Sequence, residues 1–376
     1  MLQSTELAVV GAGIVGLASA IEATRRGLAV TVVERDAQPL GASVRNFGHV
    51  YASAQGDATL ELALATRDRW LELADEAGFW ARPSGTLVVA RLPEEVVVLE
   101  EFAARRPTLA DVLGPEDARR RAPVAEDVRA ALWTPLDCRV DPRTAVPTLA
   151  RWLERERGVR FLWRTSVLGI EDGRLATSRG DVVADAVVLA TGHDLDHLLP
   201  EVAEQAGVRR CTLQMLRVAS PGDGAIEPAL TTGLALLRYR GFAECPSLGK
   251  LRARLAEERP ELLTADVNLI VTQLGDGDLV VGDTHAYGQA ASPFADERLD
   301  TLLLDEAARL LGVPRLEVRQ RWLGVYAHAR EHEFLVAAPA PSIRAVAVTS
   351  GIGMTTALGL APRVLDELFD PVPALT

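Results

Sequence analysis

The sequence predicts an α/β fold in which a parallel sheet covered by helices is combined with a second, mostly antiparallel sheet. Residues 1–34 read as one strand–helix–strand unit, and residues 345–369 return to a strand followed by a helix. Between them, short strands at residues 211–219, 267–273 and 279–281 indicate an antiparallel sheet. The first part is therefore expected to be discontinuous in sequence and interrupted by the second.

The elements follow from apolar patterning and turn residues. Gly27 ends the first helix, at residues 17–26, and the next strand, at 30–33, runs directly into Glu34. Asp141 is a plausible helix N-cap with Pro142 at the first helical position. The other predicted helices lie at 57–78, 93–121 and 141–157, and the other strands at 7–10, 86–90, 159–162, 182–190 and 345–349. This order assigns residues 1–83, 136–208 and 320–376 to the first part and residues 84–135 and 209–319 to the second.

The composition is that of an ordinary folded protein. The 376 residues are 48% hydrophobic and 24% charged, which is close to the globular average. Forty basic and 52 acidic residues give a net charge of −12, which disfavours nucleic acid and anionic membranes as partners. We expect no membrane span and no secretory leader, because the sequence shows neither pattern. Cys138, Cys211 and Cys245 have the spacing of neither a metal site nor a disulfide framework, so we expect a cytoplasmic protein without a bound metal.

Three glycines between the first strand and the first helix form a dinucleotide-binding motif. Gly11 permits the tight turn, Gly13 lets a pyrophosphate approach the backbone, and Gly16 lets the helix pack closely on the strand. The helix N-terminus then faces the phosphates. Glu34 ends the second strand, where its carboxylate would accept the ribose hydroxyls and repel a 2′-phosphate. The motif therefore argues against NADP and leaves FAD or NAD.

Later segments favour FAD, because FAD extends across a domain and needs contacts far from the first motif. Residues 43–48 would contact pyrophosphate and flavin, Val167 would present its backbone to the adenine, and residues 190–192 would close beside the cofactor. Gly351 and Gly353 open a helix whose amides would stabilise negative charge on a reduced flavin. Each segment alone is equally well an ordinary turn or cap. Together they predict that the first part is a Rossmann-like FAD-binding domain of the glutathione-reductase type and that the second part is a substrate-binding domain. The predicted cofactor contacts are Gly11, Gly13, Ile14, Val15, Gly16, Glu34, Arg35, Ala42, Ser43, Asn46, Phe47, Gly48, Val167, Ala190, Thr191, Gly192, Gly351, Ile352, Gly353, Met354 and Thr355.

With these residues in place, the whole chain resembles the D-amino-acid oxidase and glycine oxidase superfamily of FAD-dependent amine oxidoreductases. Within it, residues 43–48, 213–217, 237–239, 282–285, 321–326 and 348–351 resemble a branch associated with phosphonate degradation. The superfamily resemblance implies hydride transfer from a C–N bond to flavin N5, giving an imine that water hydrolyses to a carbonyl compound. The branch resemblance implies an aminophosphonate related to 2-aminoethylphosphonate, oxidised by deamination or N-demethylation.

Two positions depart from the pattern. Amino-acid-oxidising members often carry an arginine in a Trp-x-Gly-Leu-Arg-Pro segment, where it pairs with the substrate carboxylate, and this chain has Tyr326 in its place. A bidentate carboxylate clamp is therefore expected to be missing from its usual place, which argues against an α-amino acid substrate. His49 stands where the branch more often has methionine, so we expect a substrate that differs from that of the relatives.

The catalytic candidates are His49, His285 and Tyr326, and no triad is expected because positioning carries most of this chemistry. His49 would hydrogen-bond the substrate, or is a loop histidine bonded to backbone. His285 corresponds to an active-site histidine of the sarcosine oxidase branch, or is a solvated residue at a strand end. Tyr326 would donate its hydroxyl to the substrate or pack over the flavin.

A doubly charged phosphonate needs cations, and arginines in the relevant segments are the candidates: Arg45, Arg217, Arg238 and Arg330. Each has the alternative of an ordinary surface arginine. We place Arg45, Asn46 and Arg217 in the substrate site, and we expect Arg45→Ala to raise the substrate KM sharply.

The electron acceptor stays open between O2 and a quinone-type molecule. Sarcosine oxidases carry a lysine near the flavin on the strand equivalent to residues 279–281, and no lysine is there; Lys250, the single lysine, lies in a charged helical stretch. Relatives attach flavin covalently through a C-terminal cysteine or a histidine in the first flavin loop. This chain has no cysteine after Cys245 and has Arg45 near the place of that histidine, so we expect non-covalent FAD.

Other functions remain open at this point. A glycine, sarcosine or D-amino-acid oxidase or dehydrogenase would use the same fold. Oxidation of a 2-hydroxy acid would need a histidine base, which His285 could supply, and a carboxylate-binding arginine, which is not evident. A non-catalytic flavin-binding module would need only the cofactor motifs and would turn over no amine. The particular amine, the oligomeric state and the pathway are not determined by the sequence.

Overall fold

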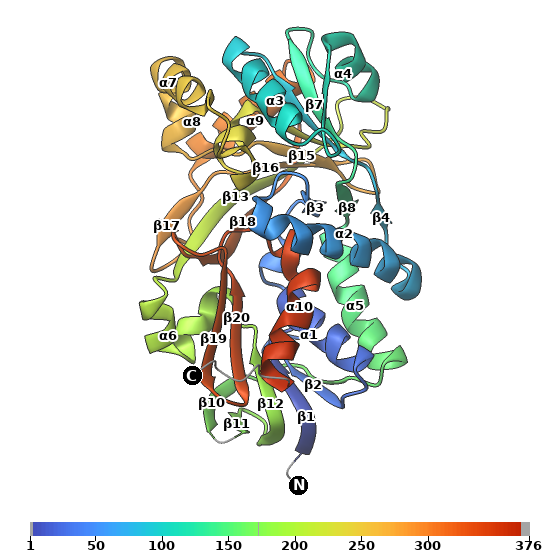
Figure 1. Cartoon of the computed structure of the whole chain (residues 1–376), viewed down its shortest axis with the longest axis vertical. Coiled ribbons are helices and arrows are strands. Elements are labelled where there is room, and N and C mark those ends of the chain that lie inside the picture. Colours follow the sequence, from blue (N-terminus) through green and yellow to red (C-terminus); the bar gives the residue numbers. More distant parts are fainter. Residues whose placement is uncertain (1–2, 172, 370–376) are drawn as a thin grey trace.

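The computed structural model describes residues 3–171 and 173–369, which form two parts that follow one another along the long axis (Figure 1). Each part is built on one large sheet. The part at the lower end of Figure 1 holds both ends of the described chain, and its first helix (Ile14–Arg25) packs against the C-terminal helix (Gly353–Phe369), far away in sequence.

The first sheet has a parallel centre. β1 lies between β2 and β12 and runs parallel to both, and β9 and β20 continue the parallel order on the two sides. In the described chain its strands are β1 (Gln3–Val10), β2 (Val30–Val33), β9 (Arg160–Leu162), β10 (Val167–Glu171), β11 (Arg174–Thr177), β12 (Val182–Leu189), β19 (Phe334–Ala340) and β20 (Ile343–Val348). The last residues of β1, β2 and β12 therefore meet at one edge, where α/β sheets bind nucleotides.

Apolar residues cover both faces of this sheet, which explains why its strands read as continuous apolar runs. Leu7 and Val9 pack on one face against helices α1 (Ile14–Arg25), α5 (Pro142–Glu156) and α10 (Gly353–Phe369), and α2 (Asp57–Ala77) packs on α10. Ala8 and Val10 pack on the other face, beside η2 (Gly192–His197) and α6 (Pro200–Gln205). Asp141 caps α5, since its Oδ1 accepts from Arg143 N at 3.0 Å, as predicted.

The second sheet is mostly antiparallel, and its one parallel pair in the described residues is β14 with β5. Its strands are β5 (Thr86–Ala90), β6 (Asp111–Leu113), β7 (Ala130–Thr134), β13 (Arg209–Val218), β14 (Ala229–Thr232), β15 (Ile270–Gln273), β16 (Leu279–Gly282), β17 (Ala286–Gly288) and β18 (Val318–His328). The helical segments of this part are α3 (Pro93–Arg105), α4 (Pro115–Arg121), η3 (Gly233–Leu237), η4 (Arg240–Phe242), α7 (Leu248–Glu258), α8 (Pro260–Thr264) and α9 (Glu297–Leu311). A small sheet of β3 (His49–Val50), β8 (Cys138–Val140) and β4 (Ala81–Arg82) lies beside α2, and η1 (Ala42–Val44) precedes β3.

Two predicted boundaries were wrong. The helix expected at residues 93–121 is broken, because Pro107 follows the end of α3 and the pair Gly114-Pro115 starts α4 after the short strand β6. Residues 320–328, which we assigned to the FAD-binding part, belong to β18, which pairs with β13 of the second sheet. The pairing of β18 is a long-range contact that no local pattern in the sequence specifies.

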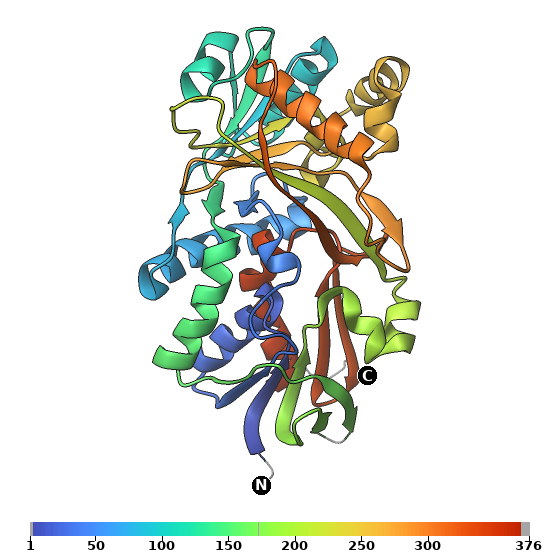
Figure 2. The same cartoon turned by 180° about the vertical axis from the view of Figure 1, so that it is seen from behind.

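The β13–β18 pair connects the two parts. The two long strands run from the upper sheet toward the lower one in Figure 1 and are seen from behind in Figure 2. Their register places Tyr326 opposite Cys211 and Trp322 opposite Met215. Tyr326 is thereby brought from the second sheet to the region between the two parts.

Candidate active site

One cavity of about 550 Å³ lies between the two parts and is lined by residues from both, a size typical of small-molecule sites. At one end, which we call the nucleotide end, the lining comes from the turns after β1, β2 and β12 and from the starts of α1 and α10. At the other end, which we call the far end, the lining is Arg238, Tyr239, Asn268, Asp283, His285 and Tyr326. The two ends belong to one continuous cavity.

The turn between β1 and α1 needs glycine because backbone atoms approach it closely. Gly11 has a φ of 104°, and a Cβ there would lie 2.5 Å from the carbonyl oxygen of Ala190. A Cβ on Gly16 would lie 2.0 Å from the carbonyl oxygen of Gly11, so Gly16 lets α1 pack against β1. The turn presents the N-terminal amides of α1 to the cavity, which suits an anionic pyrophosphate.

Ser43 and Glu34 fix this turn by hydrogen bonds. Ile14 N donates to Ser43 Oγ at 2.8 Å, and Ala12 N donates to Glu34 Oε2 at 2.8 Å. Asp36 N donates to Glu34 Oε1 at 2.9 Å. The Glu34 carboxylate is therefore held as an acceptor beside the cavity, and each oxygen keeps acceptor capacity for a hydroxyl. Its contact with a ribose stays a prediction.

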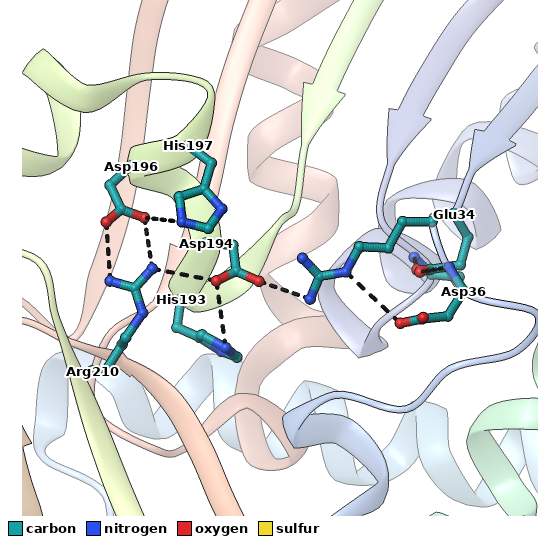
Figure 3. A network of polar contacts seen from close by, with 9 residues as sticks. Glu34, Asp36, His193, Asp194, Asp196, His197 and Arg210 are labelled. Carbon is teal, nitrogen blue, oxygen red and sulfur yellow. Dashed lines mark hydrogen bonds and ion pairs between the residues drawn. The ribbon is translucent and has the colours of Figure 1, made fainter. Parts of the chain in front are cut away.

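An ion-pair network lies beside the nucleotide end (Figure 3). Arg35 Nη2 lies 2.7 Å from Asp194 Oδ2, which links the segment after β2 to the segment after β12. Arg210 Nη2 lies 3.3 Å from Asp194 Oδ1 and 2.9 Å from Asp196 Oδ1. Burial raises the pKa of the Asp194 carboxyl, but the charges of His193 and Arg35 outweigh it, and the net pKa is lowered. Asp194 therefore stays ionised and joins the first sheet, η2 and β13.

The segment after η1 is shaped by Asn46. Its Nδ2 donates to the carbonyl oxygens of Ala42 and Ser43, both at 2.9 Å, and its Oδ1 accepts from Gly48 N at 2.7 Å. Gly48 has a φ of 66°, and a Cβ there would lie 1.8 Å from the carbonyl oxygen of Val140. Both amide hydrogens of Asn46 are thus used within the loop, and its contact with substrate stays a prediction.

The start of α10 is fixed at the cavity by bonds to α2 and to the segment after β3. Trp70 Nε1 donates to Met354 O at 2.8 Å, and Tyr51 N donates to Thr355 Oγ1 at 3.2 Å. Gly351 has a φ of 78°, and a Cβ there would lie 3.0 Å from Tyr326 Cζ. The residues at the nucleotide end therefore fit an extended dinucleotide. The glycine-rich turn would bind the phosphates, Glu34 would accept hydrogen bonds after β2, and the start of α10 lies further along the cavity.

His49 is part of a buried hydrogen-bond chain. Its Nε2 lies 2.7 Å from Thr86 Oγ1, and Thr86 Oγ1 donates to Asp137 Oδ2 at 2.8 Å. Because the Thr86 proton goes to the carboxylate, His49 Nε2 must be the donor and Nδ1 carries a lone pair. Burial, assisted by Arg139, lowers the pKa of His49 to about 3. The ring is therefore a neutral acceptor at the cavity, and the alternative of a loop histidine bonded to backbone was wrong.

Arg238 supplies a cation to the far end. Its Nη2 donates to Tyr326 Oη at 3.0 Å, and its Nη1 lies 3.4 Å from Asp266 Oδ2. The side chain is 20% exposed and lines the cavity. Position 326 holds a tyrosine, as the sequence shows, and an arginine reaches this tyrosine from the segment between η3 and η4. The absence of a carboxylate clamp at its usual place stays a prediction.

His285 is buried, with 7% of the residue exposed, so the alternative of a solvated strand-end residue was wrong. Its Nδ1 lies 2.7 Å from the carbonyl oxygen of Asp266, and its Nε2 lies 3.6 Å from Asp283 Oδ2. Burial and the charge of Arg238 lower the pKa of His285 well below its usual range. The ring is therefore neutral, like that of His49.

The structure brings the predicted residues together with few exceptions. Of the predicted cofactor residues, Gly16 and Gly48 do not line the cavity, because both are used for close backbone packing. His49, His285, Tyr326, Arg45 and Asn46 line it. Arg45 is exposed, and its Nη1 donates to Leu323 O at 3.4 Å, so it lies at the rim.

Arg217 and Arg330 are not in the site, and the prediction for Arg217 was wrong. Arg217 binds Asp276 Oδ2 and Asp278 Oδ2, each at 2.6 Å, and does not line the cavity. It is six residues along β13 from Cys211, the partner of Tyr326, which is roughly 20 Å of strand. Arg330 is exposed and does not line the cavity either.

Sequence reasoning missed Asp283, Asn268, Tyr239 and Tyr51, which all line the cavity. Asp283 had a usable signal, since it follows an apolar strand two residues before His285. Tyr239 lies in the segment 237–239 that resembles the phosphonate branch, whereas Asn268 and Tyr51 lie in segments without any motif. The placement of these three residues follows from the packing of the second sheet on the first.

Three further findings concern the described residues. No helix among residues 3–171 and 173–369 is both long and apolar enough to cross a bilayer. In the same ranges, no cluster of His, Cys, Asp and Glu is arranged to hold a metal ion. The three cysteines are free and buried, and Lys250 is exposed on α7.

A glycine-rich turn at a helix start, opening into a cavity that also reaches an antiparallel sheet, is typical of a dinucleotide-dependent oxidoreductase. The profile of the family described as FAD dependent oxidoreductase, DAO, matches residues 6–366. The chain therefore belongs to this family, and FAD is its cofactor.

Two solved structures superpose on the whole length of this chain. L-proline dehydrogenase from P. horikoshii superposes with a TM-score of 0.81 at 19% identity, covering 100% of this chain and 96% of that chain. Glycine oxidase from Geobacillus kaustophilus superposes with a TM-score of 0.80 at 18% identity, covering 100% and 97%. Both likenesses show the fold.

Among curated proteins, the tRNA 5-methylaminomethyl-2-thiouridine biosynthesis bifunctional protein of Chromohalobacter salexigens is 30% identical over 212 residues. The match covers 51% of this chain but 29% of that protein, so the chain corresponds to less than a third of its length.

Proposed function

We propose that this FAD-dependent oxidoreductase oxidises the C–N bond of a small amine that carries an acidic group. One observation carries the proposal: the nucleotide end and the far end belong to one cavity. The far end holds Arg238 bonded to Tyr326, and acceptor atoms of Asp283 and Asn268 that have no hydrogen-bond partner among the described residues. Bound FAD would supply the acceptor for the hydride that leaves the carbon next to the nitrogen.

Arg238 and Tyr326 are the groups that would bind the acidic group of the substrate. A guanidinium held by Tyr326 and Asp266 offers charge-assisted hydrogen bonds in a fixed orientation. The negative charges of Asp266 and Asp283 both act on the same guanidinium, so the local charge favours a substrate with a single negative charge.

Apolar side chains between the two sheets would exclude water from the reacting atoms. Phe47, Leu213, Ile270 and Val280 form a buried cluster with Tyr326 packed against it. A water-poor site strengthens the electrostatic contacts of Arg238 and protects the product imine until release. His49 Nδ1 adds one acceptor, which orients a donor on the ligand.

The names of proteins with this fold support an amine substrate. The two structures reported above are named a proline dehydrogenase and a glycine oxidase, and both names state an amino acid. Tyr326 would hold the substrate through the arginine that it binds, so Arg238 would act from a place other than the usual one of the clamp.

An aminophosphonate related to 2-aminoethylphosphonate is the second candidate. Its support is the resemblance of residues 213–217, 237–239 and 282–285 to the phosphonate branch and the presence of Arg45 at the rim as a second cation. Glycine, sarcosine and D-amino acids remain the alternative within the same reaction class.

The acceptor of the second half-reaction is proposed to be O2 or a quinone-type molecule. Val280 and Val281 occupy the strand where the sarcosine oxidase branch carries its lysine, and Lys250 is on α7 in the second part. The chain therefore lacks that aid to the reaction with O2, which favours a dehydrogenase.

The test is an anaerobic titration of the purified holoprotein with 2-aminoethylphosphonate, glycine, sarcosine, L-proline, a D-amino acid panel and glycolate. Bleaching of the flavin absorbance by an amine supports the proposal, and readmission of air separates an oxidase from a dehydrogenase. Bleaching by glycolate alone would replace it with hydroxy-acid oxidation, and a flavin that no compound bleaches would favour a non-catalytic module.

A further inference from the structure

Asp283, His285 and Asn268 form a cluster of hydrogen-bond acceptors at the far end of the cavity. Asn268 and Asp283 exchange backbone hydrogen bonds of 2.9 and 3.0 Å, and such paired residues send their side chains to the same face of a sheet. All three residues are more than nine-tenths buried, and all three line the cavity.

The proton positions in this cluster follow from its hydrogen bonds. The carbonyl oxygen of Asp266 can only accept, so His285 Nδ1 carries the ring proton and Nε2 is a bare acceptor. That bare nitrogen lies 3.6 Å from Asp283 Oδ2, which is also an acceptor. Asn268 Nδ2 lies 3.5 Å from Tyr239 Oη, which leaves its Oδ1 as the free end of the amide.

The acceptors have no donor of their own. Within the part of the chain that the structure describes, Asp283 Oδ1 and Asn268 Oδ1 are buried without a hydrogen-bond partner. A buried unsatisfied acceptor costs stability, so its persistence in a cavity points to a ligand that supplies the donor. Several acceptors at one place fit a donor with several N–H groups and a positive charge.

A cation of this chain is nearby but is used elsewhere. Arg238 is bonded to Tyr326 and Asp266, and among the described residues it forms no ion pair with Asp283. The charges of Arg238 and Asp283 nevertheless influence each other. The far end therefore has a positive pole at Arg238 and a separate negative pole at Asp283.

We propose that the cluster of Asp283, His285 and Asn268 binds the ammonium group of a zwitterionic substrate, and that Asp283 accepts one ammonium proton before oxidation. This inference rests on the proposed function. In the proton step, one N–H bond of the ammonium breaks, its electron pair stays on nitrogen, and an O–H bond forms on Asp283. An ammonium and a carboxylate become a neutral amine and a neutral acid, and the amine lone pair is then available to assist hydride loss from the neighbouring carbon.

This assignment makes the site selective for amines over amine-free acids. An acid without the amine would satisfy Arg238 and Tyr326 but leave the acceptors of Asp283, His285 and Asn268 unpaired. Sites that must leave buried polar groups unpaired reject such analogues strongly. The substrate class is therefore an amino acid or an aminophosphonate that enters as a zwitterion, rather than a simple alkylamine or a hydroxy acid.

The pH dependence of the proton step follows from the surroundings of Asp283. Burial raises its pKa to about 7, against the lowering effect of Arg238. Asp266 adds to the rise, and His285 and Tyr239 are the other titratable groups that face the cluster. The carboxylate form that accepts a proton therefore predominates above about pH 7, and kcat/KM should fall as the pH decreases below that value.

The test compares Asp283→Asn with wild type in holoprotein, using matched pairs of probes. The pairs are glycine with acetate, L-proline with cyclopentanecarboxylate, and 2-aminoethylphosphonate with ethylphosphonate, each measured as Kd from flavin absorbance changes during rapid mixing. For the amino probe that binds, we expect the variant to weaken binding at least about 30-fold, the effect of removing one member of a buried charge pair. The amine-free partner should bind equally well or better. Asp276→Asn removes a surface carboxylate outside the cavity and should change neither.

Two further readouts keep the proposal open to refutation. Asn268→Ala should weaken the amino probe selectively, with unchanged FAD content, even if Asp283→Asn folds poorly. The acidic limb of the kcat/KM profile near pH 7 should disappear in Asp283→Asn. Equal effects on both members of each pair, a persisting acidic limb, or wild-type protein that binds no amino probe would overturn the assignment. Selective binding of an amino probe without any flavin bleaching would instead reject the proposed function and leave the ammonium site intact.

Discussion

Replacing Arg238 with methionine tests the positive pole of the site. The substitution keeps an unbranched side chain of similar length and removes the guanidinium that donates to Tyr326 at 3.0 Å. The hydroxyl of Tyr326 and the carboxylate of Asp266 remain, so the change isolates the cation. The acidic group of the substrate then loses its charged partner.

The size of the effect follows from the environment of Arg238. The side chain is 20% exposed, so an ion pair with the substrate is largely shielded from water. Loss of one partner of such a desolvated pair costs about 2 kcal/mol or more, which is about a 30-fold change in an equilibrium constant. Tyr326→Phe removes a single neutral donor and should cost about 1 kcal/mol, or about 5-fold.

The assay is the anaerobic reduction rate of the flavin against the concentration of the amine that bleaches it. We expect Arg238→Met to raise the apparent Kd at least about 30-fold, with a smaller change in the limiting rate. Arg217→Met is the matched control, because Arg217 is held by Asp276 and Asp278 outside the cavity, and it should leave the Kd unchanged. A less than 3-fold change in Arg238→Met, or an equal change in both variants, would refute the placement of the acidic group at Arg238.

Two predictions concern the cofactor and the scaffold. Arg35→Ala breaks the 2.7 Å ion pair with Asp194, and the Arg35 side chain is 57% exposed. Because an exposed pair is weak and is screened by salt, we expect FAD to dissociate only about 2- to 5-fold faster at low salt. At high salt the difference should be lost. The increase of FAD fluorescence after dilution measures the dissociation rate. Arg25→Ala, which breaks an exposed pair with Glu72, is the control. A change in the rate that does not depend on salt would contradict the reasoning. Gly359→Ala places a Cβ 2.3 Å from Leu62 O, where α10 meets α2, and should lower the free energy of unfolding by about 1–3 kcal/mol despite the better helix propensity of alanine. The melting temperature measures the effect. The control is Gly249→Ala in α7, whose Cβ would meet nothing within 4 Å. Equal melting temperatures for the two variants would show that α10 can shift without cost.

Much of the nucleotide end could be predicted because its determinants are local. Residues 7–26 follow the order strand, glycine turn and helix. The turn requires glycine because Gly11 has a positive φ and because backbone atoms approach Gly11 and Gly16 closely. Glu34 follows β2 directly, and the parallel order of β1 and β2 brings it to the same edge as the turn. The start of α10 was predicted for the same reason, since Gly351 and Gly353 follow an apolar strand.

The far end could be predicted only in part, because its residues come from separate strands. Tyr326 and His285 were identified through a resemblance, but their partners Arg238, Asp283 and Asn268 depend on strand pairing over long sequence separations. Arg217 and Arg238 were both candidates from the sequence, and placing Arg217 in the site was wrong. Arg217 lies far along β13 from the cavity and pairs with Asp276 and Asp278. Arg238 reaches the cavity from the segment between η3 and η4.

The sequence by itself determined the nucleotide cradle, the βα character of both ends of the chain and the presence of a second, antiparallel sheet. These features follow from backbone conformation and from apolar patterning within a few residues. Tertiary structure alone decided which arginine contacts Tyr326, which ring nitrogen of each histidine carries the proton, and which buried acceptors have no hydrogen-bond partner among the described residues. Those properties depend on the partners that the β13–β18 pair, β15 and β16 bring to one cavity, and hydrogen bonding and desolvation are set by such partners rather than by the residue type.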